Sequence, residues 1–171
     1  KYCDRDILVS AKGGANPFEY VKALNNIYQN LTLPDGYELT LDLPIVESLQ
    51  GTFRVTKGVA KVKLTCNEGQ QVDMWNCFSY CSATVVDLTG FYGKIKSLSN
   101  TFMAASIVEI LGELDLSVCT STSSVFGTAW NLKEIRIKEG TLPIGISFVN
   151  CDKLSDASIQ SIIDGLADLT G

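Results

Sequence analysis

A phenylalanine recurs along the chain at a nearly constant spacing, and the residues after it repeat in kind. The members of this ladder are Phe53, Phe78, Phe102, Phe126 and Phe148. The first four are followed by a small residue three positions later and by a β-branched residue eight or nine positions later. A recurrence of about 20–29 residues, within which every step of this ladder falls, is typical of proteins that stack their repeats into a solenoid. The pattern therefore predicts that each repeat forms one turn of a coil.

A second ladder of apolar residues has the same period and predicts strands. Its members are Val62, Val86, Ile110 and Ile135. Around them apolar and charged residues alternate, as in Glu134-Ile135-Arg136-Ile137, which is typical of a strand with one buried and one exposed face. One turn cannot bury its apolar side alone, so the turns stack and their strands form a parallel sheet.

The other side of the coil is expected to be irregular or extended, because glycines mark tight corners between further alternating segments. These glycines are Gly90, Gly93, Gly112, Gly127 and Gly140. We therefore predict a β-rich leucine-rich repeat solenoid, with a parallel strand ladder and an irregular far side.

The repeat fails at both ends of the chain, where we predict capping helices. Asn16 and Pro17 resemble a helix start, and apolar residues follow with helical spacing over residues 16–30. Ser155 resembles the N-cap of a second helix with an apolar stripe, formed by Ile159, Ile162, Ile163 and Leu166. The alternative to capping is that either helix is a docking site for a partner.

These features divide the chain into three parts. Residues 1–47 are expected to contain a linker, a helix and a capping region, in which residues 31–47 form a turn and an edge strand, as in a degenerate first repeat. Residues 48–154 are expected to be leucine-rich repeats of about 24 residues. Residues 155–171 are expected to form the C-terminal capping helix.

The order of residues in the cleanest repeat, from Phe126 to Ile137, resembles the BspA-like class of bacterial leucine-rich repeats. Phe148, Cys151 and Leu154 match the first half of the same pattern. The resemblance covers about residues 48–171. It implies a protein exposed at the cell surface or secreted, with a role in adhesion or protein binding and no shared catalytic residues. The stretch from Leu154 to Leu166 and the opening Lys1–Ile7 also resemble repeat proteins of phage and prophage tails, which implies a virion as the alternative setting.

Composition and charge narrow the possible partners. The net charge of −5 argues against binding to a nucleic-acid backbone, which needs clustered Lys and Arg. No apolar run approaches the length of a membrane span. The chain lacks an initiating Met and a signal sequence, so we expect a segment of a larger parent protein with other domains.

Six cysteines leave two interpretations open. They are Cys3, Cys66, Cys77, Cys81, Cys119 and Cys151. A secreted protein can pair them as disulfides. Cys81 and Cys151, however, occupy the small inward position that Ala105 and Ala129 fill in other repeats, and we favour free buried thiols. We expect no metal site, since the chain has no Cys-x-x-Cys and no histidine.

The absence of histidine also removes Ser-His-Asp and Cys-His nucleophiles, and no phosphate-binding loop is present. A carboxylate pair such as Asp87 with Glu109 is the remaining catalytic candidate, for glycoside hydrolysis. A carboxylate on the outer face of a strand is usually just solvated, and nothing in the sequence marks these two as shifted or sheltered, so we predict no enzyme, no catalytic residue and no cofactor.

Candidate ligand-binding residues lie in the outward column of the strands, where repeat proteins commonly present their binding surface. The column contains Lys61, Lys63, Asp87, Glu109, Glu134, Arg136 and Lys138. Phe91 and Tyr92, between two glycines, form a possible exposed aromatic corner, with core packing as the equal alternative. For Trp75 and Trp130 we expect core packing. The sequence thus predicts a non-catalytic module that recognises a protein or glycan outside the cell. The alternative is a structural spacer or tip of a phage tail or surface fibre.

Overall fold

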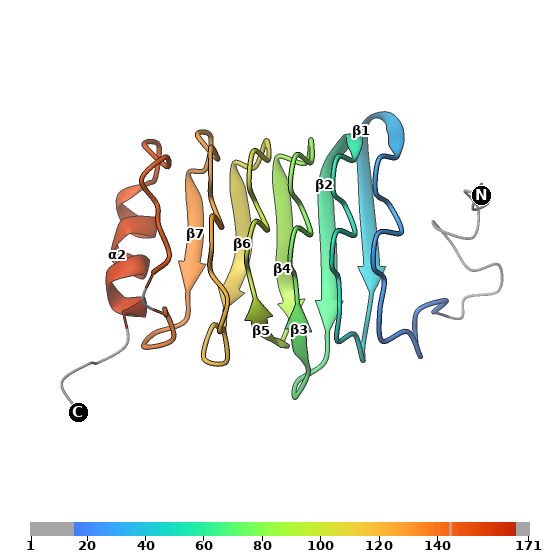
Figure 1. The fold of residues 1–171 in the computed structure, drawn as a ribbon, viewed down its shortest axis with the longest axis horizontal. Helices are drawn as coiled ribbons and strands as arrows, with labels where there is room; N and C mark the ends of the chain where they lie inside the picture. Colours follow the sequence, from blue (N-terminus) through green and yellow to red (C-terminus); the bar gives the residue numbers. More distant parts are fainter. Residues whose placement is uncertain (1–15, 144, 167–171) are drawn as a thin grey trace.

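The computed structural model describes residues 16–143 and 145–166, and in them the chain winds into a solenoid of stacked turns (Figure 1). Five parallel strands lie side by side in the order β1-β2-β4-β6-β7. Their bounds are Thr32–Asp42 for β1, Lys57–Cys66 for β2, Val85–Phe91 for β4, Glu109–Leu114 for β6 and Glu134–Ile137 for β7. Each strand follows its predecessor around one full turn, so the predicted parallel ladder is confirmed.

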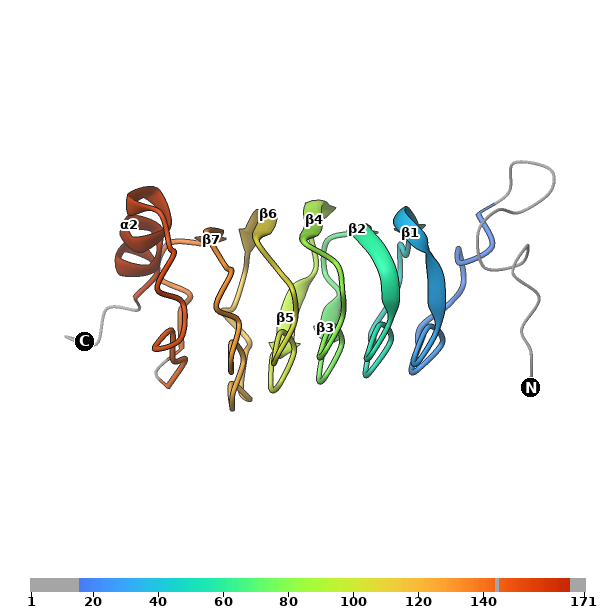
Figure 2. The same cartoon turned by 90° about the horizontal axis from the view of Figure 1, so that it is seen from above.

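At the positions of the apolar ladder, the register of the sheet is the one that the sequence predicts. Val62 pairs with Val86, Val86 pairs with Ile110, and Glu109 pairs with Glu134. The predicted inward residues of this ladder are at most 2 % exposed. Alternation between buried and exposed positions along β7 places Ile135 and Ile137 in the core. Two short strands, β3 (Gln71–Asp73) and β5 (Lys94–Ser97), pair on another side of the coil (Figure 2).

Stacked aromatic rings run through the core along the axis of the coil. Each ring contacts the ring of the next turn, with centroids 5.0–5.6 Å apart and planes within 24° of parallel. The rings of this aromatic stack belong to Tyr28, Phe53, Phe78, Phe102, Phe126 and Phe148. Such pairs contribute about 0.5–1.5 kcal/mol each beyond the burial of their area. The phenylalanine ladder is therefore the central packing element of the fold.

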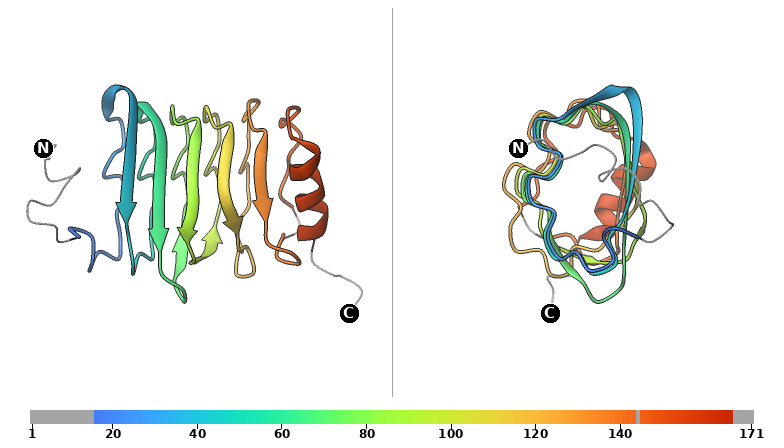
Figure 3. Two further views of the ribbon diagram at one scale, coloured as in Figure 1. Left: turned by 180° about the vertical axis from the view of Figure 1, so that it is seen from behind. Right: turned by 90° about the vertical axis from the view of Figure 1, so that its right-hand side faces the viewer.

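The far side of the coil consists of tight turns that hydrogen-bond to one another, and it is irregular as predicted (Figure 3). Asn26, Asn76 and Asn100 adopt φ of 55–60°, in the left-handed region that asparagine tolerates well. Backbone N–H groups at every second residue donate to a carbonyl of the next turn. Phe53 donates to Cys77 over 2.8 Å, and Phe102 donates to Val125 over 3.0 Å. Most polar backbone groups on this side are thus satisfied without a regular sheet.

The predicted N-terminal helix over residues 16–30 is wrong, because these residues form turns of the solenoid. Tyr28 takes the place of the phenylalanine, one turn before Phe53. Asn26 and Asn30 have φ near 60°, which an α-helix excludes. The N–H of Tyr28 donates to the carbonyl of Thr52 over 2.9 Å. Bonding to the next turn therefore overrides the local helical pattern. The predicted edge strand in residues 31–47 is confirmed as β1, whereas residues 1–15 lie outside the described part.

The predicted C-terminal helix is present as α2 (Asp156–Gly165), and it covers strand β7 (Figure 1). Ser155 caps it by accepting the N–H of Ser158 over 3.2 Å. The N–H groups on the outer edge of β7 find acceptors in the helix, since Ile135 donates to Ser158 Oγ over 3.0 Å and Ile137 donates to Ser161 Oγ over 2.9 Å. The helix therefore protects the sheet edge with serine hydroxyls.

The predicted apolar stripe of α2 faces inward only at Ile162, which packs against the core. The buried residues of the helix are Ser158 and Gly165, while Ile159 is 45 % and Ile163 is 54 % exposed. A Cβ at Gly165 would lie 2.7 Å from Ile137 Cγ2, so this face must be small. The need to satisfy the edge of β7 has decided which face turns inward.

Candidate ligand-binding surface

The outward column predicted from the sequence lies on one face of the five-stranded sheet. The pairing register aligns one row across four strands, and it contains Lys61, Val85, Glu109 and Glu134. Lys63 pairs with Asp87 in the next row. Arg136 pairs with Glu113, because β6 carries two additional residues between Glu109 and Glu113. Lys138 follows the end of β7 and lies at the corner of the coil rather than in the column.

Asp87 belongs to the column but is only 5 % exposed. Its carboxylate pairs with Lys61 Nζ over 3.0 Å and accepts the N–H and hydroxyl of Thr89 over 3.1 and 2.7 Å. Burial alone would raise the pKa of Asp87, but the hydrogen bonds from Thr89 and Lys61 lower that pKa to about 2. These contacts lie in the middle of β4, where the register with β2 shifts. Asp87 therefore has a structural role whether or not a ligand reaches it.

The outward faces of β6 and β7 form an open groove of about 500 Å³, which we call the strand groove. Its polar lining residues are Thr89, Glu109, Glu113, Glu134 and Arg136. Gly112 widens β6 here, with φ of +92° and a hypothetical Cβ 2.6 Å from the Leu88 carbonyl carbon. Bulges of this kind redirect side chains and are frequent beside binding sites. The strand groove thus brings Glu109, Glu134 and Arg136 together, as predicted from the column.

A second hollow, the corner cleft, lies where the strands turn away from the sheet, and it measures about 440 Å³. Its lining residues come from the corners of successive turns, and they include Glu68, Tyr92, Lys94, Glu113, Asp115 and Lys138. Phe91 is 7 % exposed and belongs to the core, whereas Tyr92 is 64 % exposed. The predicted exposed aromatic corner is therefore confirmed for Tyr92 and wrong for Phe91, whose side chain packs in the core.

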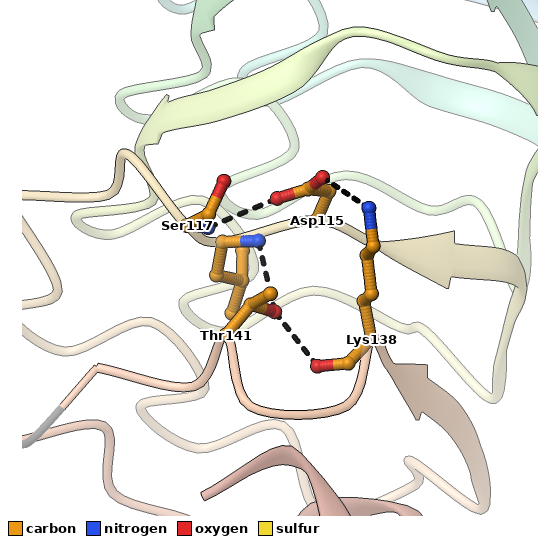
Figure 4. Close-up of polar contacts among 5 residues, drawn as sticks. Asp115, Ser117, Lys138 and Thr141 are labelled. Atoms are coloured by element: carbon orange, nitrogen blue, oxygen red, sulfur yellow. Dashed lines mark hydrogen bonds and ion pairs between the residues drawn. The ribbon is translucent and has the colours of Figure 1, made fainter. Parts of the chain in front are cut away.

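A hydrogen-bonded network holds one wall of the corner cleft (Figure 4). Asp115 accepts from Lys138 Nζ over 2.8 Å and from the Ser117 N–H over 3.0 Å. Thr141 Oγ1 accepts the N–H of Leu116 over 3.2 Å and donates to the Lys138 carbonyl over 2.8 Å. Burial acts to raise the pKa of Asp115, but the bonds from Lys138 and Ser117 outweigh it and lower that pKa to about 2. Asp115 is ionised at neutral pH and is fixed in place.

The sequence did not single out Asp115, Glu113 or Lys94, although one signal was available. Asp87-Leu88-Thr89 and Asp115-Leu116-Ser117 share an acidic residue followed two positions later by a hydroxyl residue. That spacing favours an Asx turn, and both carboxylates do accept the N–H two residues on. The expected core packing of the tryptophans is wrong, because Trp75 is 45 % and Trp130 is 62 % exposed.

The cysteines of the described residues are free, and most of them are buried. Cys81 and Cys151 occupy the inward position predicted for them, at 1 % and 5 % exposure. Burial raises the pKa of the Cys66, Cys81 and Cys151 thiols to about 11. Cys3 lies outside the described part. Between residues 16 and 166, residue 144 apart, no cluster of three or more His, Cys, Asp or Glu side chains is arranged to hold a metal ion.

The described residues form a parallel β-solenoid whose surface carries the strand groove and the corner cleft. The chain matches no protein-family model, no curated protein and no solved structure. Among the described residues no helix has the length and hydropathy of a membrane span.

Proposed function

We propose that this chain is a non-catalytic leucine-rich repeat module, of the BspA-like kind, that recognises a protein or a glycan outside the cell. The observation that carries the proposal is the joining of the strand groove and the corner cleft along one flank of the coil. Thr89 and Glu113 line both hollows, so the two hollows form one extended surface that presents both charged and apolar groups. A solenoid supplies such a surface on a rigid frame.

The chemistry of this surface favours binding over turnover. The two carboxylates with lowered pKa, Asp87 and Asp115, are held by ion pairs with Lys61 and Lys138. A glycoside hydrolase needs one carboxyl group with a raised pKa as its general acid. The remaining polar residues of the grooves suit direct contacts with a partner. The extracellular or virion setting rests on the resemblance of the repeats.

The second candidate function is a structural spacer or tip in a tail or surface fibre. The exposed apolar residues of α2 and of the residue after it favour this function, since Ile159, Ile163 and Leu166 are 45–59 % exposed at one end of the coil. A spacer joins other subunits through its ends, whereas a binding module uses its flank. The two functions therefore predict different sensitive residues.

A binding screen of the folded chain tests the proposal. Intact bacterial cells, epithelial cells, mucins and a glycan array serve as probes. A saturable signal that falls on substitution Arg136→Ala or Tyr92→Ala, without loss of thermal stability, supports recognition through the flank. No signal from any probe, together with self-association abolished by Ile163→Asp, would favour the spacer.

A further inference from the structure

Tyr92 is an exposed aromatic residue on a corner whose backbone is held in place. Its N–H donates to the Cys66 carbonyl over 2.9 Å. On one side Phe91 is anchored in the core, and on the other Gly93 is buried, with a hypothetical Cβ 3.0 Å from Cys66 Sγ. The corner cannot rotate without losing these contacts. The backbone at Tyr92 is therefore fixed beside the cleft, and a tyrosine side chain has only two rotatable angles to lose on binding, which keeps the entropic cost of the contact low.

The corner cleft crosses four successive turns at equivalent positions. Glu68, Tyr92, Asp115 and Lys138 follow one another at close to the repeat length, and all four line the cleft. Neighbouring strands lie about 4.8 Å apart, so these positions span about 14 Å along the axis. That span exceeds one sugar ring and suits an extended chain lying across the corners.

The cleft offers hydrogen-bond acceptors and donors of both charge signs. Glu68, Glu113 and Asp115 supply carboxylates, and Lys94 and Lys138 supply ammonium groups. The charges nearly cancel, which gives little preference for a strongly charged ligand. A carboxylate has about four acceptor sites, and the contacts to Lys138 and Ser117 use two of those on Asp115. Asp115 can therefore accept further hydrogen bonds from hydroxyl groups.

From this arrangement we infer that the corner cleft binds an uncharged oligosaccharide, with one sugar ring stacked on Tyr92 and hydroxyl groups bonded to Asp115 and Lys138. The inference rests on the proposed recognition function and names its ligand class. An amphipathic aromatic ring beside fixed polar groups matches the apolar face and hydroxyl edge of a sugar. Networks already held in place lose little freedom on binding, and the Thr141 bonds hold this one.

The test is a glycan array of neutral and anionic oligosaccharides, followed by calorimetric titration of any neutral hit. Tyr92→Ala should weaken the Kd at least about tenfold, whereas Tyr92→Phe should change it less, because the ring is kept. Tyr80→Ala is the matched control, since Tyr80 is 52 % exposed and lies in the turn segment of the far side. Equal melting temperatures for the variants exclude misfolding.

Four outcomes separate the inference from the proposed function. Neutral saccharide binding that depends on Tyr92 but not on Tyr80 supports both. Saccharide binding that is indifferent to Tyr92→Ala, or that is confined to anionic chains, overturns the inference. Binding to a protein or mucin probe that depends on Arg136, with no hit on the array, overturns the inference and leaves the proposed function standing. Failure of every probe overturns both.

Discussion

Phe102 lies in the middle of the aromatic stack, and its replacement by alanine tests the packing of the whole coil. The ring is 1 % exposed and lies between Phe78 and Phe126, with both centroids at 5.6 Å and both planes within 3° of parallel. Loss of a buried phenylalanine side chain removes about 1.5–3 kcal/mol of burial. Two lost ring pairs add about 1–3 kcal/mol.

We therefore expect Phe102→Ala to lower the free energy of unfolding by about 3–5 kcal/mol, which is also the usual cost of this substitution in a core. Unfolding in urea, followed by far-ultraviolet circular dichroism, measures the change through linear extrapolation. A destabilisation of this size is a large part of the total stability of a domain, so the urea concentration at which half of the protein is unfolded should fall measurably.

Two control variants make the prediction specific to the stack. Phe148 ends the stack, is only partly buried and has Phe126 as its one ring neighbour among the described residues, so Phe148→Ala should cost about half as much. Tyr80→Ala removes an exposed ring and should change stability by less than about 0.5 kcal/mol. A cost for Phe102→Ala below about 1 kcal/mol, or equal to that of Phe148→Ala, would refute the reasoning.

Three further predictions concern the edges and bulges of the sheet. The free energy of unfolding should fall as the pH drops from about 4 towards 2, because protonation removes the ion pair of Asp87, whose pKa is about 2 in the folded protein against an ordinary value of 3.8. Urea unfolding at a series of pH values measures this dependence, and Asp87→Asn should remove about 1–2 kcal/mol of it. An unchanged pH profile in this variant would contradict the role of Asp87. Ser158→Ala should destabilise the protein by about 1–3 kcal/mol in the same assay, since the buried Ile135 N–H loses its acceptor, whereas Ser106→Ala, at an exposed serine, should be near neutral. Gly112→Ala should lower the melting temperature in a thermal scan, because a Cβ would clash with the Leu88 carbonyl at φ of +92°, and a melting temperature equal to the parent's would show that β6 relaxes at no cost.

The parallel strand ladder could be predicted because the apolar residues that specify it recur in every repeat. Two apolar ladders with one period specify the strand register, and Val62, Val86 and Ile110 pair as the ladders require. The N-terminal turn escaped prediction because tyrosine replaced phenylalanine in the ladder at Tyr28. A helix and a pair of tight turns share short apolar spacings, and only hydrogen bonds to the following turn distinguish them.

The candidate site was predictable in part. The sequence placed Glu109, Glu134 and Arg136 on one exposed face, and the structure joins them in the strand groove. It could not place Lys138 beside Asp115, because β6 carries extra residues that shift its register against β7. Bulges are local departures from the period, so a periodic argument cannot locate them.

The sequence by itself determined the coil, since stacking of one repeat on the next is the way in which these ladders bury their apolar residues. The tertiary structure alone decided which side chains remain accessible. Asp87 became nearly buried under neighbouring turns, and Tyr92 was turned outward by a corner whose other members are packed in the core. The face that α2 turns inward was likewise set by its neighbour, because the unpaired N–H groups of β7 required serine oxygens. Periodicity specifies which residues share a face, whereas exposure and pairing depend on neighbours that lie a full turn away in the chain.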